Sequence, residues 1–478
     1  MSTQLRQLLD LINGAAATLD KSCSVNGTRI PDPHEPFDPE SEAFRTDPIA
    51  ENAANIIGAA ALQLAALVLP PHLVMFSMIG GQWNCAALRL CLDTHVTEIL
   101  REAGPEGMHV KDIEAKNGID ASKMARCLRL LSIQHVYREV KPDVFANTRL
   151  STLLDTLKPS KKIIADPEHK HDHTNGFPAF ASFLLDEWFK SSAYLLENIT
   201  DPKTRKSGDP ADAPFARSDV HGKSIWEFYG QPEKKVREQR FNIGMKGLLS
   251  MLPGNFASEA FDWRSLPKDA LVVDVGGGVG MVPMAVAREH SHLKFIIQDR
   301  PTVIWKQEIP SALQSGRVKL EAHDFFTTQP QKDASVFILK HILHNWADDY
   351  SLTILKHLRA AATPPKTRLI CIDAILPYAC RNAASSAGGI PGAFTVEAPE
   401  PLIANWGLVS GTAFYMDSIM MMACNSQERT IGQFDELFRK AGWKIVAVRH
   451  GNATRPLALA AIEAVPIEYE RKQPRSRL

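Results

Sequence analysis

The chain has 478 residues, too many for one ordinary hydrophobic core, so we expect more than one domain. Lysine plus arginine equals aspartate plus glutamate at 54 each, and this balance argues against a nucleic-acid partner, which would favour a basic surface. The seven cysteines are scattered and form no CxxC pair, which argues against a disulfide scaffold or zinc knuckle and favours a reducing, cytoplasmic location.

Residues 1–92 are predicted to form a helical N-terminal extension. An amphipathic helix is expected from about Gln4 to Ile12, followed by a Pro-rich, acidic linker. The segment 56–81 is apolar enough to suggest a membrane helix, but Pro70 and Pro71 break it, and neither half reaches the length of a span. We therefore expect no membrane, and we interpret this segment as helices that bury apolar surface against a partner or a second subunit.

Residues 93–157 have the pattern of a winged helix. Helices are predicted over 93–104, over 111–118 and after Asp120, which is expected to be an N-cap residue, and the stretch VYREVKPDVFANT predicts a hairpin. A winged helix makes a DNA-binding regulator an alternative. The helix near 121–134 carries no dense basic face, which argues against DNA.

Residues 158–262 are interpreted as a helical linker with helices of a substrate pocket. Three histidines alternate in one polar segment: His169, His171 and His173. A metal site there is conceivable, but no regular element is evident to fix the ligand geometry, so a solvated loop is favoured.

From residue 263 to 478, strand-like and helix-like segments alternate. Strands are predicted at 271–275, 294–298, 318–322, 335–340 and 368–374, and two more near the C-terminus. This alternation is typical of an α/β fold whose mostly parallel sheet is covered by helices on both faces. The segment 377–413 is rich in small residues and proline, and its role stays open as a lid, an interface loop or a flexible insertion.

The first of these strands runs into the glycine-rich stretch LVVDVGGGVG at 271–280. A glycine turn at the carboxyl end of a strand allows a nucleotide-like ligand close to the backbone. The dinucleotide pattern GxGxxG fails because Met281 occupies the third glycine position, and no GK[ST] follows for a P-loop. A nucleoside with a small charged tail fits better, which points to S-adenosylmethionine.

Acidic side chains at three consecutive strand ends support this ligand. Asp299 follows the second strand and can accept both ribose hydroxyls. Asp324 follows the third strand and can take the adenine amino group, while Phe325 can lie against the ring. The predicted cofactor-binding set from this reasoning is Asp274, Gly276, Gly278, Gly280, Asp299, Asp324 and Phe325.

At the fourth strand the sequence reads FILKHILHNWADD (337–349). Together with VVDVGGGVG, IIQDRPTVI, HDFF, ICIDAILP and NSQERT before FDELFRKAGW, it resembles the S-adenosylmethionine-dependent O-methyltransferases of the caffeate and flavonoid type and their fungal secondary-metabolite relatives. The resemblance implies a Rossmann-like class I methyltransferase domain with a seven-stranded sheet, preceded by a winged-helix dimerisation domain in a homodimer. It further implies that Lys340 helps to hold the polar tail of the cofactor.

The same resemblance makes His344 the general base, flanked by Asp373 and Glu428. Histidine suits this task because its unperturbed pKa of about 6.5 leaves it mostly neutral at pH 7. A phenol, with a pKa of about 10, is a poor nucleophile until its proton is removed. The sulfonium methyl group is already electrophilic, so no metal is required. Asp373 stands where relatives often have glutamate, which leaves open which carboxylate contacts the ring.

The predicted substrate is a small phenolic molecule whose pocket is lined by Met420, Met421 and Asn425. An alternative is a relative that binds S-adenosylmethionine but catalyses a dehydration or pericyclic step without methylation. The sequence names neither the acceptor nor the position methylated.

Overall fold

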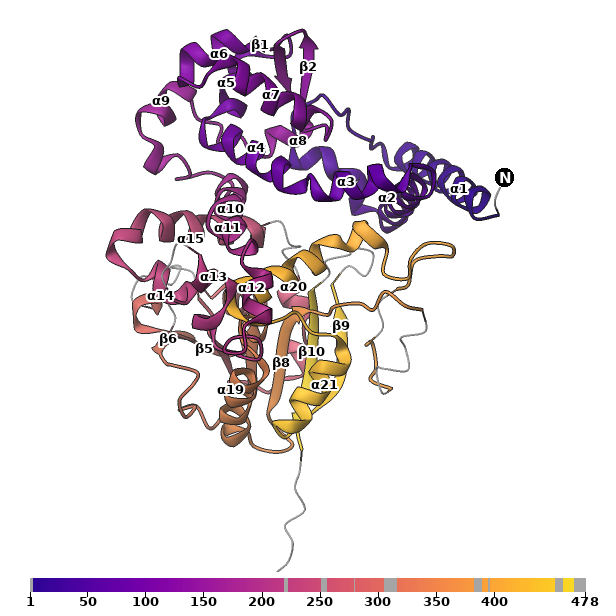
Figure 1. The fold of residues 1–478 in the computed structure, drawn as a ribbon. Coiled ribbons are helices and arrows are strands. Elements are labelled where there is room, and N and C mark those ends of the chain that lie inside the picture. Colours follow the sequence, from indigo (N-terminus) through magenta and orange to yellow (C-terminus); the bar gives the residue numbers. More distant parts are fainter. Residues whose placement is uncertain are drawn as a thin grey trace, which may run out of the picture. The chain divides into compact units, whose positions relative to one another are not determined.

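The structure is a computed structural model that describes residues 3–218, 222–250, 256–278, 280–304, 316–381, 389–393, 396–451 and 459–467. The chain folds into two compact units (Figure 1). The first comprises Met1–Lys206 and Ala211–Leu252, and the second comprises Ser207–Pro210 and Pro253–Leu478. The finer division of the chain at residues 92, 157 and 262 stays a prediction.

The first unit is helical except for one small sheet. Its N-terminal part contains α1 (Thr3–Asn26), η1 (Pro39–Thr46), α2 (Pro48–Val68), α3 (Pro71–Ile79) and α4 (Gly81–Asp93). The first helix extends well past its predicted end at Ile12. Leu8, Ala15, Leu19 and Cys23 continue one buried stripe at helical spacing, and α1 packs along α2 through it.

The observed length of α2 contradicts the argument that segment 56–81 is too short on either side of its prolines to contain a membrane helix. It begins at Pro48, with Asp47 as its N-cap, and its 21 residues make it long and apolar enough to cross a membrane by length and composition alone. Its polar residues Glu51 and Asn55 are buried within the protein. Only 22% of its most apolar 18-residue window is buried inside the protein, so the argument from length against a membrane helix is wrong, and the expected absence of a membrane stays a prediction.

The predicted winged-helix order is present in the next segment. It consists of α5 (Val96–Ala103), β1 (Met108–His109), α6 (Val110–Asn117), α7 (Ala121–Ser132), β2 (Tyr137–Lys141) and β3 (Val144–Asn147). The strands form an antiparallel sheet of order β1-β3-β2. The side chain of Asp120 accepts the backbone N–H of Lys123 and so caps α7 as the sequence predicted.

The remaining elements of this unit are short helices followed by one long helix. They are α8 (Arg149–Thr152), α9 (Ser160–Ala165), η2 (Pro167–His169), α10 (Phe177–Phe183), η3 (Leu184–Trp188), α11 (Phe189–Ser192), α12 (Leu195–Thr200), η4 (Pro210–Asp212), α13 (Pro214–Arg217), α14 (Ile225–Tyr229), η5 (Pro232–Lys234) and α15 (Lys235–Ser250). The prediction of a solvated histidine loop is wrong for one residue. His169 is exposed and pairs with Asp166, whereas His171 is buried, and its pKa is lowered to about 2, chiefly by that burial.

The second unit contains the seven-stranded sheet that the sequence predicted. Its strands are β4 (Leu271–Val275), β5 (Lys294–Asp299), β6 (Val318–Ala322), β7 (Val336–Lys340), β8 (Arg368–Ala374), β9 (Trp443–His450) and β10 (Leu459–Pro466). Their order is β6-β5-β4-β7-β8-β10-β9. The first five are parallel, and β10 runs antiparallel to both β8 and β9. The predicted α/β class and mostly parallel sheet are therefore confirmed.

Helices cover this sheet and complete its core. They are α16 (Phe256–Glu259), η6 (Trp263–Ser265), α17 (Met281–Glu289), α18 (Pro301–Ile304), η8 (Leu343–Asn345), α19 (Asp348–Ala361), η10 (Gly407–Ser410), α20 (Gly411–Cys424) and α21 (Ile431–Lys440). Figure 1 shows α19 and α21 alongside the strands. Both contribute apolar residues to one buried cluster with β4, β7 and β8. Within the insertion 377–413, residues 382–388 and 394–395 lie outside the described residues.

The strand order reverses direction at β4. The chain moves outward from β4 to β5 and β6 on one side, then returns to β7 and β8 on the other. Ligands of such sheets bind in the crevice beyond the carboxyl ends of the strands at this point of reversal. We therefore expect a ligand to bind near the residues that end β4 and β7.

Candidate active site

The glycine turn after β4 has the conformation that its spacing suggested. Gly276, Gly278 and Gly280 all have positive φ, at 72°, 53° and 70°, a region that side chains rarely adopt. A Cβ at Gly280 would also collide with Cδ1 of Ile297 on β5. The alternating glycines are thus required by the backbone itself, and they leave the turn bare where a ligand approaches.

Asp274 and Asp299 lie on either side of this turn. Asp299 ends β5, and its Oδ2 accepts the N–H of Gly278 at 2.9 Å, which ties the turn to the neighbouring strand. Asp274 on β4 is almost fully buried, and its Oδ1 accepts no hydrogen bond from the described residues. Burial raises the pKa of Asp274 to about 7. An unpaired buried carboxyl beside a bare turn fits a ligand with a polar, positively charged tail.

Asp324 and Phe325 follow β6 and reach the same edge of the sheet. The Asp324 side chain accepts the N–H of Phe326 at 2.9 Å and so closes the turn. A Cβ at Gly276 would lie 3.4 Å from a ring carbon of Phe325, which places this ring beside the glycine turn. The same ring packs edge-on against Phe326 and Trp346.

Lys340 ends β7, on the other side of the reversal point from Asp274. Burial lowers the pKa of this lysine, while the negative charges of Asp274 and Asp373 oppose that shift. Because parallel strands end at a common edge, the structure brings together all the predicted cofactor residues from β4 to β7.

His344 lies in the turn η8 that follows β7, and it is mostly buried. Its Nδ1 lies 2.8 Å from Oε1 of Glu428, which belongs to the loop before α21. Burial alone would lower the pKa of His344, but the charge and hydrogen bond of Glu428 outweigh it, so this pKa is raised. With Nδ1 engaged, Nε2 is the ring nitrogen that remains to accept a proton.

Asp373, the other predicted acid, makes different contacts from Glu428. It is fully buried on β8, and among the described residues it makes no hydrogen bond to His344. Within the described part of the chain its Oδ2 accepts only the weak S–H donor of Cys371, at 3.4 Å, and its Oδ1 lies 3.7 Å from Nδ1 of His341. Burial raises the pKa of Asp373 to about 7. The sequence left open which carboxylate contacts the ring of His344. In the structure Glu428, and not Asp373, is its hydrogen-bond partner.

The residues around Glu428 fix the histidine turn, and sequence reasoning did not single them out. The Ser426 hydroxyl donates to the carbonyl of His344 at 2.6 Å, and Asp417 accepts the N–H of Glu428 at 2.9 Å. Arg429 is buried and donates to the carbonyl of Leu343 at 2.7 Å. The sequence did carry a signal for two of them, since Ser426 and Arg429 stand in the motif NSQERT.

The predicted pocket residues lie at the end of α20. Met420 is buried, whereas Met421 is 37% exposed. Asn425 ends the helix with a φ of 53°, and its side chain donates to the carbonyl of Asp209 at 2.8 Å. Lining of an acceptor pocket by these residues stays a prediction.

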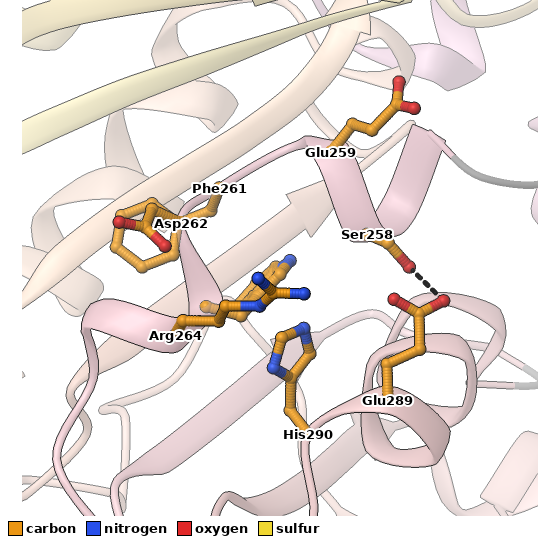
Figure 2. A pocket seen from close by; sticks show the side chains of 8 residues that line it. Ser258, Glu259, Phe261, Asp262, Arg264, Glu289 and His290 are labelled. Carbon is orange, nitrogen blue, oxygen red and sulfur yellow. Dashed lines mark hydrogen bonds between the residues drawn. The ribbon is translucent and has the colours of Figure 1, made fainter.

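A separate cavity of about 430 Å³ lies in the same unit, lined by Ser258, Glu259, Phe261, Asp262, Trp263, Arg264, Glu289 and His290. Figure 2 shows the Ser258 hydroxyl against Glu289, a hydrogen bond of 2.9 Å. These residues directly precede β4 and β5, so the cavity lies at the amino ends of the strands. It is therefore distinct from the edge that carries His344.

Comparisons with known proteins identify the family of the chain. Residues 199–390 match the family model of the O-methyltransferase domain. The chain is 44% identical over 472 residues to 4-O-methyltransferase 1 of Phanerochaete chrysosporium. The alignment covers 98% of this chain and 100% of the relative.

Two solved structures resemble the chain at lower identity. The SAH-bound form of CalO1, a methyltransferase in calicheamicin biosynthesis, is 25% identical, with a TM-score of 0.57 over 83% of this chain and 98% of that one. A pericyclic reaction enzyme is 18% identical, with a TM-score of 0.62 over 96% of this chain and 100% of that one, and this likeness concerns the fold alone. By its near full-length relative, the chain belongs to the O-methyltransferase family, a family of enzymes that use S-adenosylmethionine as cofactor.

Proposed function

We propose that this enzyme methylates a phenolic hydroxyl of a small aromatic molecule, with His344 as general base. One observation carries the proposal: Glu428 lies 2.8 Å from Nδ1 of His344. A carboxylate on one ring nitrogen fixes the tautomer in which the other nitrogen, Nε2, is free of its proton. His344 is thereby held as a proton acceptor at the edge of the sheet.

The proton balance follows from this geometry. When bound, S-adenosylmethionine supplies an electrophilic methyl group on a positively charged sulfur. His344 Nε2 would take the acceptor's hydroxyl proton as the hydroxyl oxygen bonds to the methyl carbon. The methyl–sulfur bond would break, S-adenosylhomocysteine would leave, and the charge of Glu428 would stabilise the resulting imidazolium. Help of this kind is typically worth about 10²- to 10⁴-fold in rate.

The cofactor would be held at the reversal point of the sheet. The residues proposed for this task are Asp274, Gly276, Gly278, Gly280, Asp299, Asp324, Phe325 and Lys340. The bare glycine turn and the unpaired Oδ1 of Asp274 support this assignment, because both suit a close ligand with a cationic group. The name of the Phanerochaete relative supports an oxygen as the atom methylated.

A homodimer is proposed from the surface of the first unit. The helix α3 has no buried residue, although most of its side chains are apolar. With its neighbours it forms an exposed apolar surface of Leu62, Leu67, Val68, Leu69, Leu73, Met75, Phe76, Met78, Ile79 and Trp83, here called the α3 surface. Many exposed large apolar side chains on consecutive helices are typical of a protein interface. A second copy of the chain is the partner we propose.

The proposal is tested with His344→Ala and a matched control, His357→Ala, which removes a histidine of α19. We expect the first variant to bind the cofactor like the parent but to lose about 10²- to 10⁴-fold in turnover on phenols. The control should keep its rate. Equal turnover in all three proteins would show that His344 is not the base.

A labelled methyl group separates the proposed reaction from the alternative without methylation. Incubation with labelled cofactor and a panel of phenols should give a product that carries the label. A product that forms without label would instead support the dehydration or pericyclic reaction.

A further inference from the structure

Two histidines and an aspartate meet beside the proposed base. His341 and His344 follow β7, and Asp373 lies near the end of the adjacent strand β8. One ring nitrogen of each histidine and one carboxylate oxygen all lie within 4.8 Å of one another. The backbone fixes this approach, since the N–H of His341 donates to the carbonyl of Ile372 at 3.0 Å.

Asp373 contributes an unsatisfied oxygen to this cluster. The residue is 0% exposed, and its Oδ1 has no hydrogen-bond partner among the described residues. That oxygen lies 3.7 Å from Nδ1 of His341, too far for a hydrogen bond. A buried polar atom left unpaired has lost its hydration without a replacement hydrogen bond, so a ligand that it can bind is favoured there.

His344 has the environment of a metal ligand as well as that of a base. Histidines that bind metals usually donate their other ring N–H to a carboxylate, which orients the ring. Glu428 provides that contact to Nδ1 at 2.8 Å. The lone pair of Nε2 is therefore available either to a proton or to a cation.

We propose that His341, His344 and Asp373 form a binding site for a zinc ion, which inhibits the enzyme. Two imidazoles and one carboxylate are a set that zinc uses with a fourth, open position. Magnesium is disfavoured because it prefers oxygen ligands in an octahedron. The ligand atoms of a tetrahedral zinc lie about 3.3 Å apart, so distances between ligand atoms in the cluster have to shorten by up to about 1.5 Å, through side-chain rotation. The side chain of His341 is 27% exposed, which leaves a path for the ion.

The inhibitory part of this inference rests on the proposed function. A zinc ion on Nε2 of His344 occupies the lone pair that would take the phenol proton. The binding part is independent of any reaction, because it depends only on three side chains. The two parts therefore need separate measurements.

Binding is measured on the metal-free full-length protein with Co²⁺ as a spectroscopic probe and Zn²⁺ as its competitor. We expect the visible absorption bands of tetrahedral Co²⁺, lost on addition of one equivalent of Zn²⁺. His341→Asn and Asp373→Asn should each weaken Zn²⁺ binding by roughly 100-fold or more, because a direct ligand contributes more than the 10- to 100-fold of an outer partner. Asparagine at position 341 also tolerates the local φ of 53°.

A matched control excludes binding by surface histidines. His169 pairs with Asp166 on the surface of the first unit, so His169→Asn should bind Zn²⁺ like the parent. Circular dichroism and thermal unfolding confirm that each variant is folded. Absent Co²⁺ bands in the parent, or equal affinity in the parent and His341→Asn, would overturn the site.

Inhibition is measured as the Zn²⁺ concentration that halves the methylation rate, relative to the zinc-free rate of the same protein. His341→Asn should raise this concentration about as much as it weakens binding, and a chelator should restore the parent's rate. If zinc binds but no phenol is methylated, the proposed function fails and the site stands. If His344→Ala abolishes methylation but Zn²⁺ does not bind, the site fails and the function stands.

Discussion

His344 and Glu428 are separated by 84 positions in the chain, and a 2.8 Å contact joins the histidine Nδ1 to the carboxylate. The contact depends on tertiary structure, since η8 follows β7 and Glu428 precedes α21. Ser426 and Arg429, on either side of Glu428, bond to carbonyls of the histidine turn itself. One short segment thus holds both the histidine backbone and the histidine ring.

Replacement of Glu428 by glutamine should move the pH dependence of methylation. The charge of Glu428 raises the pKa of His344, so the base is protonated, and inactive, below that raised pKa. Without the charge, this pKa falls and the acid limb of kcat/KM moves to lower pH. The plateau rate should fall by roughly 10- to 100-fold, a part of the general-base contribution.

The control for this variant is Glu436→Gln, which neutralises an exposed acid of α21 that pairs with Lys440. Its pH profile should match that of the parent. If the acid limb of Glu428→Gln stays in place while that variant is folded, Glu428 does not govern the base.

Cofactor binding should strengthen as the pH rises from about 6 to 8. Burial raises the pKa of Asp274 to about 7, so in the free enzyme this carboxyl loses its proton across that range. Only the ionised carboxylate attracts the cationic groups of S-adenosylmethionine. Calorimetric titration at several pH values measures the change, and Asp274→Asn should bind more weakly with a flatter pH dependence. An unchanged pH dependence in Asp274→Asn would contradict the assignment.

Alanine at Gly280 should damage the turn in two separable ways. The positive φ should lower the free energy of unfolding of the alanine variant by about 1–2 kcal/mol, and the new Cβ meets Cδ1 of Ile297. Gly278→Ala is the matched control, because it has positive φ but no atom within 4 Å of its Cβ. We expect Gly280→Ala to lower the thermal stability more than Gly278→Ala does.

A second substitution tests the steric part. Ile297→Val removes Cδ1, the atom that the new Cβ would meet. Alone, this substitution should lower the free energy of unfolding by about 0.5–1.5 kcal/mol. Combined with Gly280→Ala it should recover part of the lost stability. Purely additive losses would show that the collision is relieved in some other manner.

The α3 surface should carry the dimer contact. Phe76 and Met78 are 65% and 78% exposed, so Phe76→Glu with Met78→Glu should leave the fold intact. We expect the parent to elute as a dimer in size-exclusion chromatography with light scattering, and the double variant as a monomer. Ile133→Glu, at another exposed apolar residue, is the control and should stay dimeric. A monomeric parent would contradict the proposal.

The sequence by itself determined the sheet, the glycine turn and the candidate base. Alternating apolar strands and helices predict a parallel sheet from local pattern alone, and the observed β4 spans the predicted residues 271–275. The alternating glycines indicate a turn whose backbone needs residues without a side chain, and their positive φ angles confirm this. Motif order then placed His344 after the fourth strand.

The tertiary structure decided which groups touch. Asp373 and Glu428 were both candidates for His344 in the sequence. Among the described residues Glu428 hydrogen-bonds to its ring, while Asp373 lies 3.7 Å from Nδ1 of His341. The direction of a side chain depends on strand register and on a left-handed residue such as His341, whose φ is 53°. Burial of His171 and the full length of α2 likewise depend on packing partners that local composition does not contain. Local pattern specifies elements, whereas contacts between distant residues follow from how those elements pack.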